Sequence, residues 1–139
     1  MKVSEIEKTM CLLHDSRKAN RQYLANLGKR VGIDIEFFVA GNGKDTELTY
    51  DRVDTNEFKN KTIFICQREM VWRAFDQKCN NILMLEDDVT FTKDFIQILE
   101  QVELPEEWHG INLGGYCQHP NMIDCYYHMD VLLINPGRM

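Results

Sequence analysis

Three consecutive carboxylates, Glu86, Asp87 and Asp88, follow the apolar run Ile82–Leu85. Such a run, bounded by polar residues, is typical of a strand buried on both faces. Open α/β sheets bind ligands at the carboxyl ends of their strands, where these acids would lie. Because side chains alternate along a strand, Glu86 and Asp88 are the predicted ligands of one Mg²⁺ or Mn²⁺, with Asp87 pointing the other way. A solvated loop whose charges cap the next helix is the alternative, and spacing alone does not separate the two.

A second group of candidates follows the first predicted strand, Met10–Leu13. His14 and Asp15 come at its carboxyl end and could contact the base or ribose of a nucleotide. Asp15 or Ser16 could equally cap the helix that follows.

Basic side chains then occupy the start of that helix, where they oppose the helix dipole. They are Arg17, Lys18 and Arg21. A bound diphosphate would account for this arrangement, because it would use both the basic side chains and the free N–H groups of the helix start. A solvated helix face is the alternative.

Ligand-type residues also gather near the end of the chain. They are Cys117, His119, Asp124, Cys125, His128 and Asp130. The spacing of the cysteines and histidines follows no standard zinc pattern. An ordinary polar loop is the default interpretation, with structural zinc as an alternative.

The elements that must position these residues alternate along the chain. We predict a helix of about 15 residues ending near Gly32, from its four-residue apolar spacing. The other predicted elements are a strand at Ile33–Ala40, a polar irregular segment at Lys44–Lys61, a helix at Thr62–Lys78 with Asn80-Asn81 as its stop, the acidic strand, a helix that Thr92 caps and Pro105 limits, a strand at Gly110–Gly115 ending in a glycine turn, a loop at Tyr116–Met129 and a strand at Asp130–Ile134. This order predicts one α/β domain with a mainly parallel sheet.

The same spacing predicts which helix faces are buried. The first helix would bury Ala19, Tyr23, Leu27 and Val31. The second would bury Ile63, Cys66, Met70 and Ala74, and its apolar face would be widened by Phe64, Val71 and Phe75. The third would bury Phe95, Ile98, Leu99 and Val102. So broad a surface on the second helix implies that it is well covered. Trp72 and Trp108 are predicted to pack in the core or at its rim.

Composition narrows the class of protein. The 139 residues fit one domain, and the net charge of −6 argues against non-specific nucleic-acid binding, which needs a basic surface. No apolar run approaches the roughly 18 residues of a membrane span, and the first ten residues lack the apolar core of a signal peptide. Five scattered cysteines are most simply free thiols in a reducing compartment, so we expect a cytoplasmic protein.

The sequence phrase Leu85–Val89 (LEDDV), preceded by a helix that contains Trp72, resembles the glycosyltransferase family 25 domain of lipooligosaccharide biosynthesis. That family begins with a strand and an arginine-rich helix, and its acidic phrase is its DxD-type motif. Further similar phrases are Cys11–Lys18 with Arg21, Phe37–Gly43, Ile111–Gly115 and Val131–Gly137. Gln67-Arg68 stand where the family has Ser-His.

The resemblance implies a Rossmann-like GT-A fold, a three-layer αβα arrangement, over residues 1–139, without the usual C-terminal acceptor part. It implies inverting transfer of a sugar from a nucleotide-diphosphate donor to a saccharide or glycolipid hydroxyl, with Mn²⁺ or Mg²⁺. The implied roles are metal binding by Glu86 and Asp88, donor binding by His14, Asp15, Arg17 and Arg21, support of the ribose or loop by Asp87, and general base catalysis by Asp130 or Asp124. Many GT-A enzymes also take a further metal or base ligand from a later segment, so His128, Asp124 or Asp130 could approach the acidic residues.

Two other functions stay open. A shortened GT-A domain could bind nucleotide, a partner protein or a second copy of itself without turnover. A Mg²⁺-dependent phosphotransfer or nuclease domain is the third hypothesis, although the acidic net charge counts against a nuclease.

Overall fold

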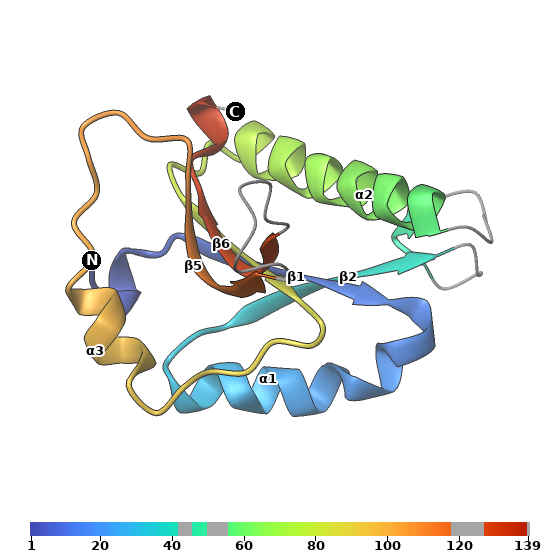
Figure 1. The fold of residues 1–139 in the computed structure, drawn as a ribbon, viewed down its shortest axis with the longest axis horizontal. Coiled ribbons are helices and arrows are strands. Elements are labelled where there is room, and N and C mark those ends of the chain that lie inside the picture. Colours follow the sequence, from blue (N-terminus) through green and yellow to red (C-terminus); the bar gives the residue numbers. More distant parts are fainter. Residues whose placement is uncertain (42–45, 50–55, 118–126, 139) are drawn as a thin grey trace.

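The computed structural model describes residues 1–41, 46–49, 56–117 and 127–138, and its centre is one six-stranded sheet (Figure 1). The strands are β1 (Lys8–His14), β2 (Ile35–Gly41), β3 (Leu48–Thr49), β4 (Ile82–Glu86), β5 (Gly110–Cys117) and β6 (Tyr127–Ile134). The helices are α1 (Arg21–Arg30), α2 (Asn56–Asp76) and α3 (Phe95–Glu100), with short 3₁₀ helices η1 (Val3–Glu5), η2 (Asp15–Asn20) and η3 (Pro136–Arg138).

The sheet is mixed, in the order β3-β2-β1-β4-β6-β5. Strand β1 runs parallel to both β2 and β4, and β2 runs parallel to β3. Strand β6 is antiparallel to β4 and to β5, so only this edge of the sheet departs from parallel pairing. The predicted α/β class is confirmed, and the parallel strands are those that carry the candidate site.

Alternate residues of the central strands enter two separate cores. On one face, Leu12 and Met84 pack with Met70 and Ala74 of α2. On the other face, Leu13, Leu85 and their neighbours pack with Leu24 of α1. Helices α1 and α2 therefore cover opposite faces of the sheet (Figure 1).

This topology creates a switch point between β1 and β4. Helix α1 connects β1 to β2 on one side of β1, whereas the chain leaves β4 toward the opposite edge of the sheet. Neighbouring parallel strands whose outgoing connections diverge leave a crevice at their carboxyl ends, and open α/β sheets bind ligands in such crevices.

The first helix differs from the prediction at its start. Residues Asp15–Asn20 form η2, and α1 begins only at Arg21. A four-residue spacing advances about 40° per step around an α-helix, and the buried face of α1 is centred on Leu24 and Gly28, roughly 100–140° from Tyr23. Tyr23 is consequently 61% exposed, against the prediction, and Leu24 takes the buried position.

The predicted end of this helix is confirmed. Gly32 has a φ of 79°, which favours glycine, and the N–H of Ile33 donates to the Gly28 carbonyl at 2.9 Å.

Helix α2 begins at Asn56, inside the segment that we predicted to be irregular, and ends at Asp76. The predicted buried residues Cys66, Met70, Val71 and Ala74 are buried; the side chain of Ile63 lies outside the described residues. The predicted widening by Phe64 and Phe75 is wrong, because these side chains are 63% and 56% exposed. Trp72 is 53% exposed and is therefore no core residue.

The stop of α2 comes before Asn80-Asn81. Lys78 has a φ of 60°, and the N–H of Cys79 donates back to the Ala74 carbonyl at 3.0 Å, a left-handed helix end formed by a residue other than glycine.

The third helix is shorter than predicted. It begins at Phe95 with Asp94 as its N-cap residue, and no side chain caps it, so the predicted cap by Thr92 is wrong. Leu99 is buried as predicted, whereas Ile98 is 56% exposed because six residues present only one narrow buried stripe.

Strands β5 and β6 extend into the predicted loop. Strand β5 continues past Gly115 to Cys117, and β6 begins at Tyr127. Antiparallel pairing supplies hydrogen bonds to both extensions, so the glycine pair interrupts the register of β5 without ending the strand. Across the described ranges, we find no helix with both the length and the apolar character that a membrane span requires.

Candidate functional site

The acidic cluster forms a turn at the carboxyl end of β4. The strand ends at Glu86, and the N–H of Val89 donates to the Glu86 carbonyl at 3.3 Å. The Val89 side chain is 4% exposed and anchors the turn in the core that faces α1. Strand alternation therefore orders the acids only as far as Glu86, and Asp87 and Asp88 take their directions from the turn.

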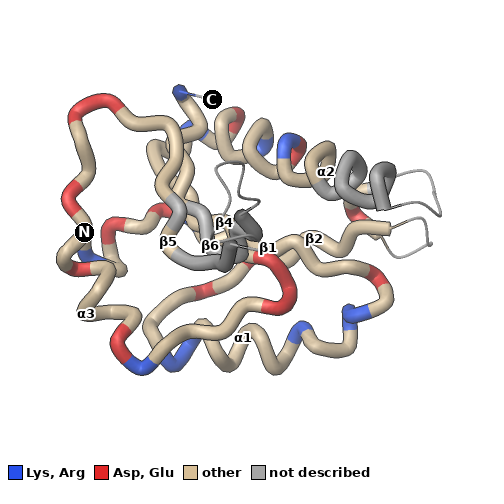
Figure 2. Tube along the Cα trace, in the orientation of Figure 1, with Lys and Arg blue, Asp and Glu red and all other residues tan. Residues whose placement is uncertain are grey.

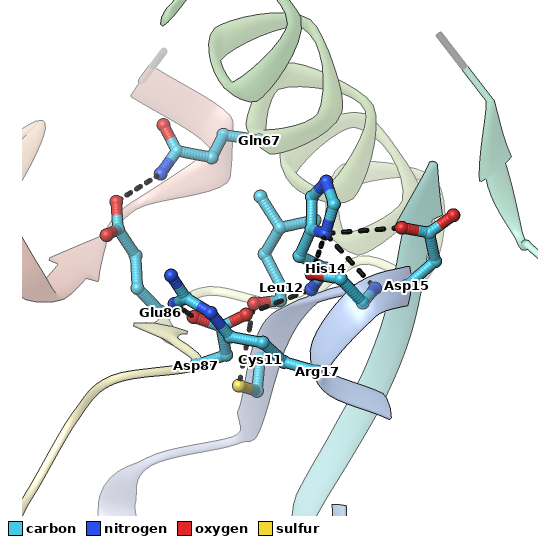
Figure 3. Close-up of polar contacts among 9 residues, drawn as sticks. Cys11, Leu12, His14, Asp15, Arg17, Gln67, Glu86 and Asp87 are labelled. Atoms are coloured by element: carbon cyan, nitrogen blue, oxygen red, sulfur yellow. Dashed lines mark hydrogen bonds and ion pairs between the residues drawn. The ribbon is translucent and has the colours of Figure 1, made fainter. Parts of the chain in front are cut away.

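Asp87 ties this turn to the end of β1, across the switch point (Figure 3). Its Oδ2 accepts a hydrogen bond from the His14 main-chain N–H at 3.0 Å, and its Oδ1 lies 2.6 Å from Nη1 of Arg17. The Asp87 side chain is 9% exposed and that of Arg17 is 52% exposed. Asp87 is thus a mostly buried acceptor, and Arg17 presents about half of its side chain to solvent at the crevice.

His14 organises the start of η2. Its Nδ1 accepts from the Ser16 main-chain N–H at 3.2 Å, and it lies 2.7 Å from Ser16 Oγ and 3.2 Å from Asp15 Oδ1. His14 therefore caps η2, and the predicted capping by Asp15 or Ser16 is wrong. Strand β1 ends at His14 and η2 begins at the next residue, so the His14 imidazole can reach the main-chain N–H of Ser16.

Asp15 lies against the end of β2. A Cβ added at Gly41 would overlap the Asp15 carboxyl group, so glycine at this position is what lets the carboxylate approach the strand. Strands β2, β1 and β4 are parallel and end at the same edge of the sheet. His14 and Asp15 lie there at the end of β1, beside the end of β2, and Asp87 lies there at the end of β4.

Glu86 points to the other face of the sheet, toward α2. The Nε2 of Gln67 donates to its Oε1 at 3.4 Å, so α2 contacts the carboxyl end of β4 through this pair (Figure 3). Gln67 was singled out in the sequence only as a difference from the resembling family. Its spacing one and two turns from buried Met70 and Ala74 could have placed it beside the sheet, but not against Glu86.

The negative charge of the turn reaches into the sheet. The pKa of the Cys11 thiol is raised from its usual 9.0 to about 12. Burial is the largest cause of this rise, and the negative charges of Asp87, Glu86 and Asp88 contribute the rest. Cys11 is 1% exposed. Carboxylates that influence a buried thiol in the neighbouring strand create a negative potential that a bound cation would offset. Figure 2 shows the acidic turn and the basic residues of η2 at the same end of the sheet.

The donor set suits a hard divalent cation. Glu86 is half-buried and Asp88 is exposed, and both offer carboxylate oxygens. Within the described ranges, no three side chains of His, Cys, Asp or Glu come together as a ready-made metal cage. Mg²⁺ is commonly held by one or two carboxylates together with substrate phosphates and waters, so a pair of acids at an open crevice is compatible with it.

Arg21 lies away from the acidic turn. Its guanidinium stacks on Phe37 at 5.3 Å, and Phe37 pairs with Cys11 in the middle of β1 rather than at its carboxyl end. Of the basic side chains at the helix start, the structure therefore joins Arg17 to the acids and places Arg21 on the face of the sheet.

The two predicted bases have different outcomes. Val131 pairs with Leu85, so the main chain of the preceding residue, Asp130, lies beside Glu86 at the crevice. The side chain of Asp130 is outside the described residues, and Asp124 lies wholly outside them. The zinc alternative falls on the same part of the chain, which leaves it a hypothesis.

The chain matches no protein-family model and no curated protein.

Proposed function

We propose that this protein is a metal-dependent glycosyltransferase of the family 25 type, with a three-layer αβα GT-A fold. It would transfer a sugar from a nucleotide-diphosphate donor to a hydroxyl of a saccharide or glycolipid, as in lipopolysaccharide biosynthesis. The observation that carries the proposal is the acidic turn at the β1–β4 switch point, joined through Asp87 to Arg17 and His14. Helices on both faces of the sheet support the fold assignment.

Glu86 and Asp88 would hold the Mn²⁺ or Mg²⁺ ion. Such an ion supplies charge neutralisation to a departing diphosphate. The carboxylate oxygens of these two residues at the end of β4 fit this role. Asp87 would hold the turn in place, since its two oxygens already accept hydrogen bonds from His14 and Arg17.

Arg17 is the group best placed to bind the donor diphosphate. Asp87 fixes its position through Nη1, while about half of the side chain stays exposed and can donate to phosphate oxygens. His14 and Asp15, beside it at the ends of β1 and β2, would contact the ribose or base. Arg21 is less well placed, because it stacks on Phe37.

An inverting transfer is a single displacement and needs a general base for the acceptor hydroxyl. We propose Asp130 for this role, because its main chain lies beside Glu86. Asp124 is the alternative.

Thermal unfolding in the presence of nucleotide sugars tests the proposal. We expect a UDP-, GDP- or CMP-sugar with Mn²⁺ to raise the melting temperature, because a ligand that binds only the folded state stabilises it. The rise should disappear in Asp88→Ala and persist in Asp34→Ala, which removes an exposed carboxylate far from the crevice. Absence of any metal-dependent rise across the donors would refute donor binding.

Turnover is a separate measurement. Release of the nucleotide (UDP or GDP, or CMP from a CMP-sugar) and transfer of the sugar to saccharide acceptors should be lost in Asp130→Asn, while the donor-induced rise in melting temperature remains. That combination is expected of a residue that acts on the acceptor and not on the donor.

A second candidate function is donor or partner binding without turnover. The exposed apolar residues of α2 favour it, because large exposed apolar side chains are typical of protein-binding surfaces. Donor-dependent stabilisation with neither hydrolysis nor transfer would support this candidate.

A further inference from the structure

The outer side of α2 carries an apolar surface that nothing in the candidate site uses. Its large side chains are Phe64, Ile65, Trp72 and Phe75, which are 63%, 45%, 53% and 56% exposed. At about 100° per residue, they lie on the side of the helix opposite to buried Cys66, Met70 and Ala74. Helix α2 lies along one face of the sheet, so this side points away from the molecule (Figure 1).

Trp72 stands at the centre of a short ridge with opposite charges at its two ends. Arg68 lies one turn before it and Asp76 one turn after it, and both are exposed. The Arg68 guanidinium stacks over the Trp72 ring at 4.8 Å. Stacking of this kind orients both side chains before any partner arrives.

This ridge is complementary to itself when two copies of α2 run antiparallel. A two-fold axis through Trp72 brings Arg68 of one copy opposite Asp76 of the other, and the symmetry repeats the pair. In this register the two Trp72 side chains meet at the axis, and Phe75 of each copy comes opposite Glu69 of the other. Phe64 and Ile65 come opposite residues 80 and 79, which follow α2, so the Trp72 pair and the two Arg68–Asp76 pairs define the register.

The size of the surface is also adequate for a small interface. Four large side chains, each about half exposed, offer on the order of 400 Å² of apolar surface per copy, within the usual range of the largest patch on a monomer. In the Trp72-centred register two copies bury at most about 800 Å² of apolar surface, below the roughly 1,200 Å² of the smallest standard interfaces, so the dimer is expected to be weak.

We propose that the outer face of α2 binds a second copy of this chain, in an antiparallel pair centred on Trp72. The pairing does not depend on the proposed catalytic function, because the site residue of α2, Gln67, faces the sheet.

Analytical ultracentrifugation of the full chain between about 1 and 200 μM tests this proposal. We expect a reversible monomer–dimer equilibrium, with Kd in the micromolar range for so small an interface. Trp72→Ala should weaken dimerisation on the order of tenfold or more, since central Trp residues dominate interfaces. The matched control is Ile98→Ala, which removes an equally exposed apolar side chain from α3 and should leave the Kd unchanged.

Charge exchange tests the register. Arg68→Glu and Asp76→Arg, made singly, each place like charges opposite one another and should weaken the dimer. The double variant Arg68→Glu/Asp76→Arg restores opposite charges and should recover most of the affinity. Circular dichroism verifies that each variant is folded. A chain that stays monomeric throughout the concentration range overturns the proposal, as does a double variant that dimerises no better than the single variants.

Discussion

Removal of the Asp87 carboxylate should destabilise the fold more than removal of its ionic partner. Asp87 accepts one hydrogen bond from the His14 main chain and one from Arg17, and its side chain is 9% exposed. We expect the two contacts to contribute unequally to stability. The donor of the first is a backbone N–H, whereas the donor of the second is a half-exposed guanidinium that solvent screens.

The structure gives the size of each contribution. A hydrogen bond from a backbone N–H to a charged acceptor contributes about 1.5–3 kcal/mol, and its loss leaves the His14 N–H without this acceptor. Because Arg17 is 52% exposed, solvent screening limits its ion pair to about 1 kcal/mol or less. We therefore expect Asp87→Ala to lower the free energy of unfolding by about 2–3 kcal/mol, and Arg17→Ala by about 0.5–1 kcal/mol.

Asp87→Asn separates the two contacts. Its amide oxygen can still accept from the His14 N–H, so the expected loss is only about 1 kcal/mol.

Urea denaturation followed by far-ultraviolet circular dichroism measures all three variants. Thermal unfolding gives a second measurement. For a chain of this size, the loss of about 2–3 kcal/mol expected for Asp87→Ala corresponds to a fall in melting temperature of roughly 6–12 °C. An Asp87→Ala variant no less stable than Arg17→Ala would refute the reasoning, because the His14 hydrogen bond would then contribute nothing.

Four further predictions concern the strands that carry the candidate site. Gly41→Ala should lower the free energy of unfolding by about 1–3 kcal/mol, because the new Cβ overlaps the Asp15 carboxyl group; Gly137→Ala, where the nearest atom is 3.6 Å away, should cost less in the same urea titration. Cys11 should resist iodoacetamide at pH 8 in the folded chain and react after unfolding, as peptide mass spectrometry would show. The pKa of this thiol is raised to about 12, so between pH 9 and 12 the folded chain keeps a proton that the unfolded chain loses. The thiol's contribution to stability is therefore complete below pH 9 and falls as the pH rises from 9 to 12. Cys11→Ala should show a shallower decline in the free energy of unfolding over that range. Leu83→Ala, at a fully buried position of β4, should cost about 2–5 kcal/mol by urea denaturation, and an unchanged midpoint would contradict the assigned core.

The sequence was sufficient to predict that the two halves of the candidate site lie at one edge of the sheet. A continuous apolar run needs burial on both faces, and acids at its end must then lie at the carboxyl edge, as Glu86 does. His14 follows from the same reasoning for β1.

The contacts within the site could not be predicted. Alternation orders side chains only inside a strand, and the chain leaves β4 at Glu86, so the direction of Asp87 depends on the turn anchored by Val89. Its partner Arg17 was identifiable as a basic residue, but the pairing joins residues 70 positions apart in the sequence.

Helix faces were predicted less well for a different reason. Periodicity shows which side chains lie together, but not which neighbours cover them. Phe64 and Phe75 have the apolar character of core residues, yet the sheet reaches only the side of α2 that carries Met70. Tyr23 was misplaced because residues four apart drift around a helix of about 3.6 residues per turn and so do not share one face.

The position of β1 between β2 and β4 also sets the order in which the crevice can assemble during synthesis. Strand β1 can pair with β2 once the short connection through α1 is made, whereas its other neighbour becomes available only after residues 82–86 have emerged. The hydrogen bond from His14 to Asp87 spans 73 positions, and the pairing of β1 with β4 closes the same long loop, so both form together. We therefore expect the group formed by His14, Arg17 and Asp87 to assemble only when β4 pairs with β1.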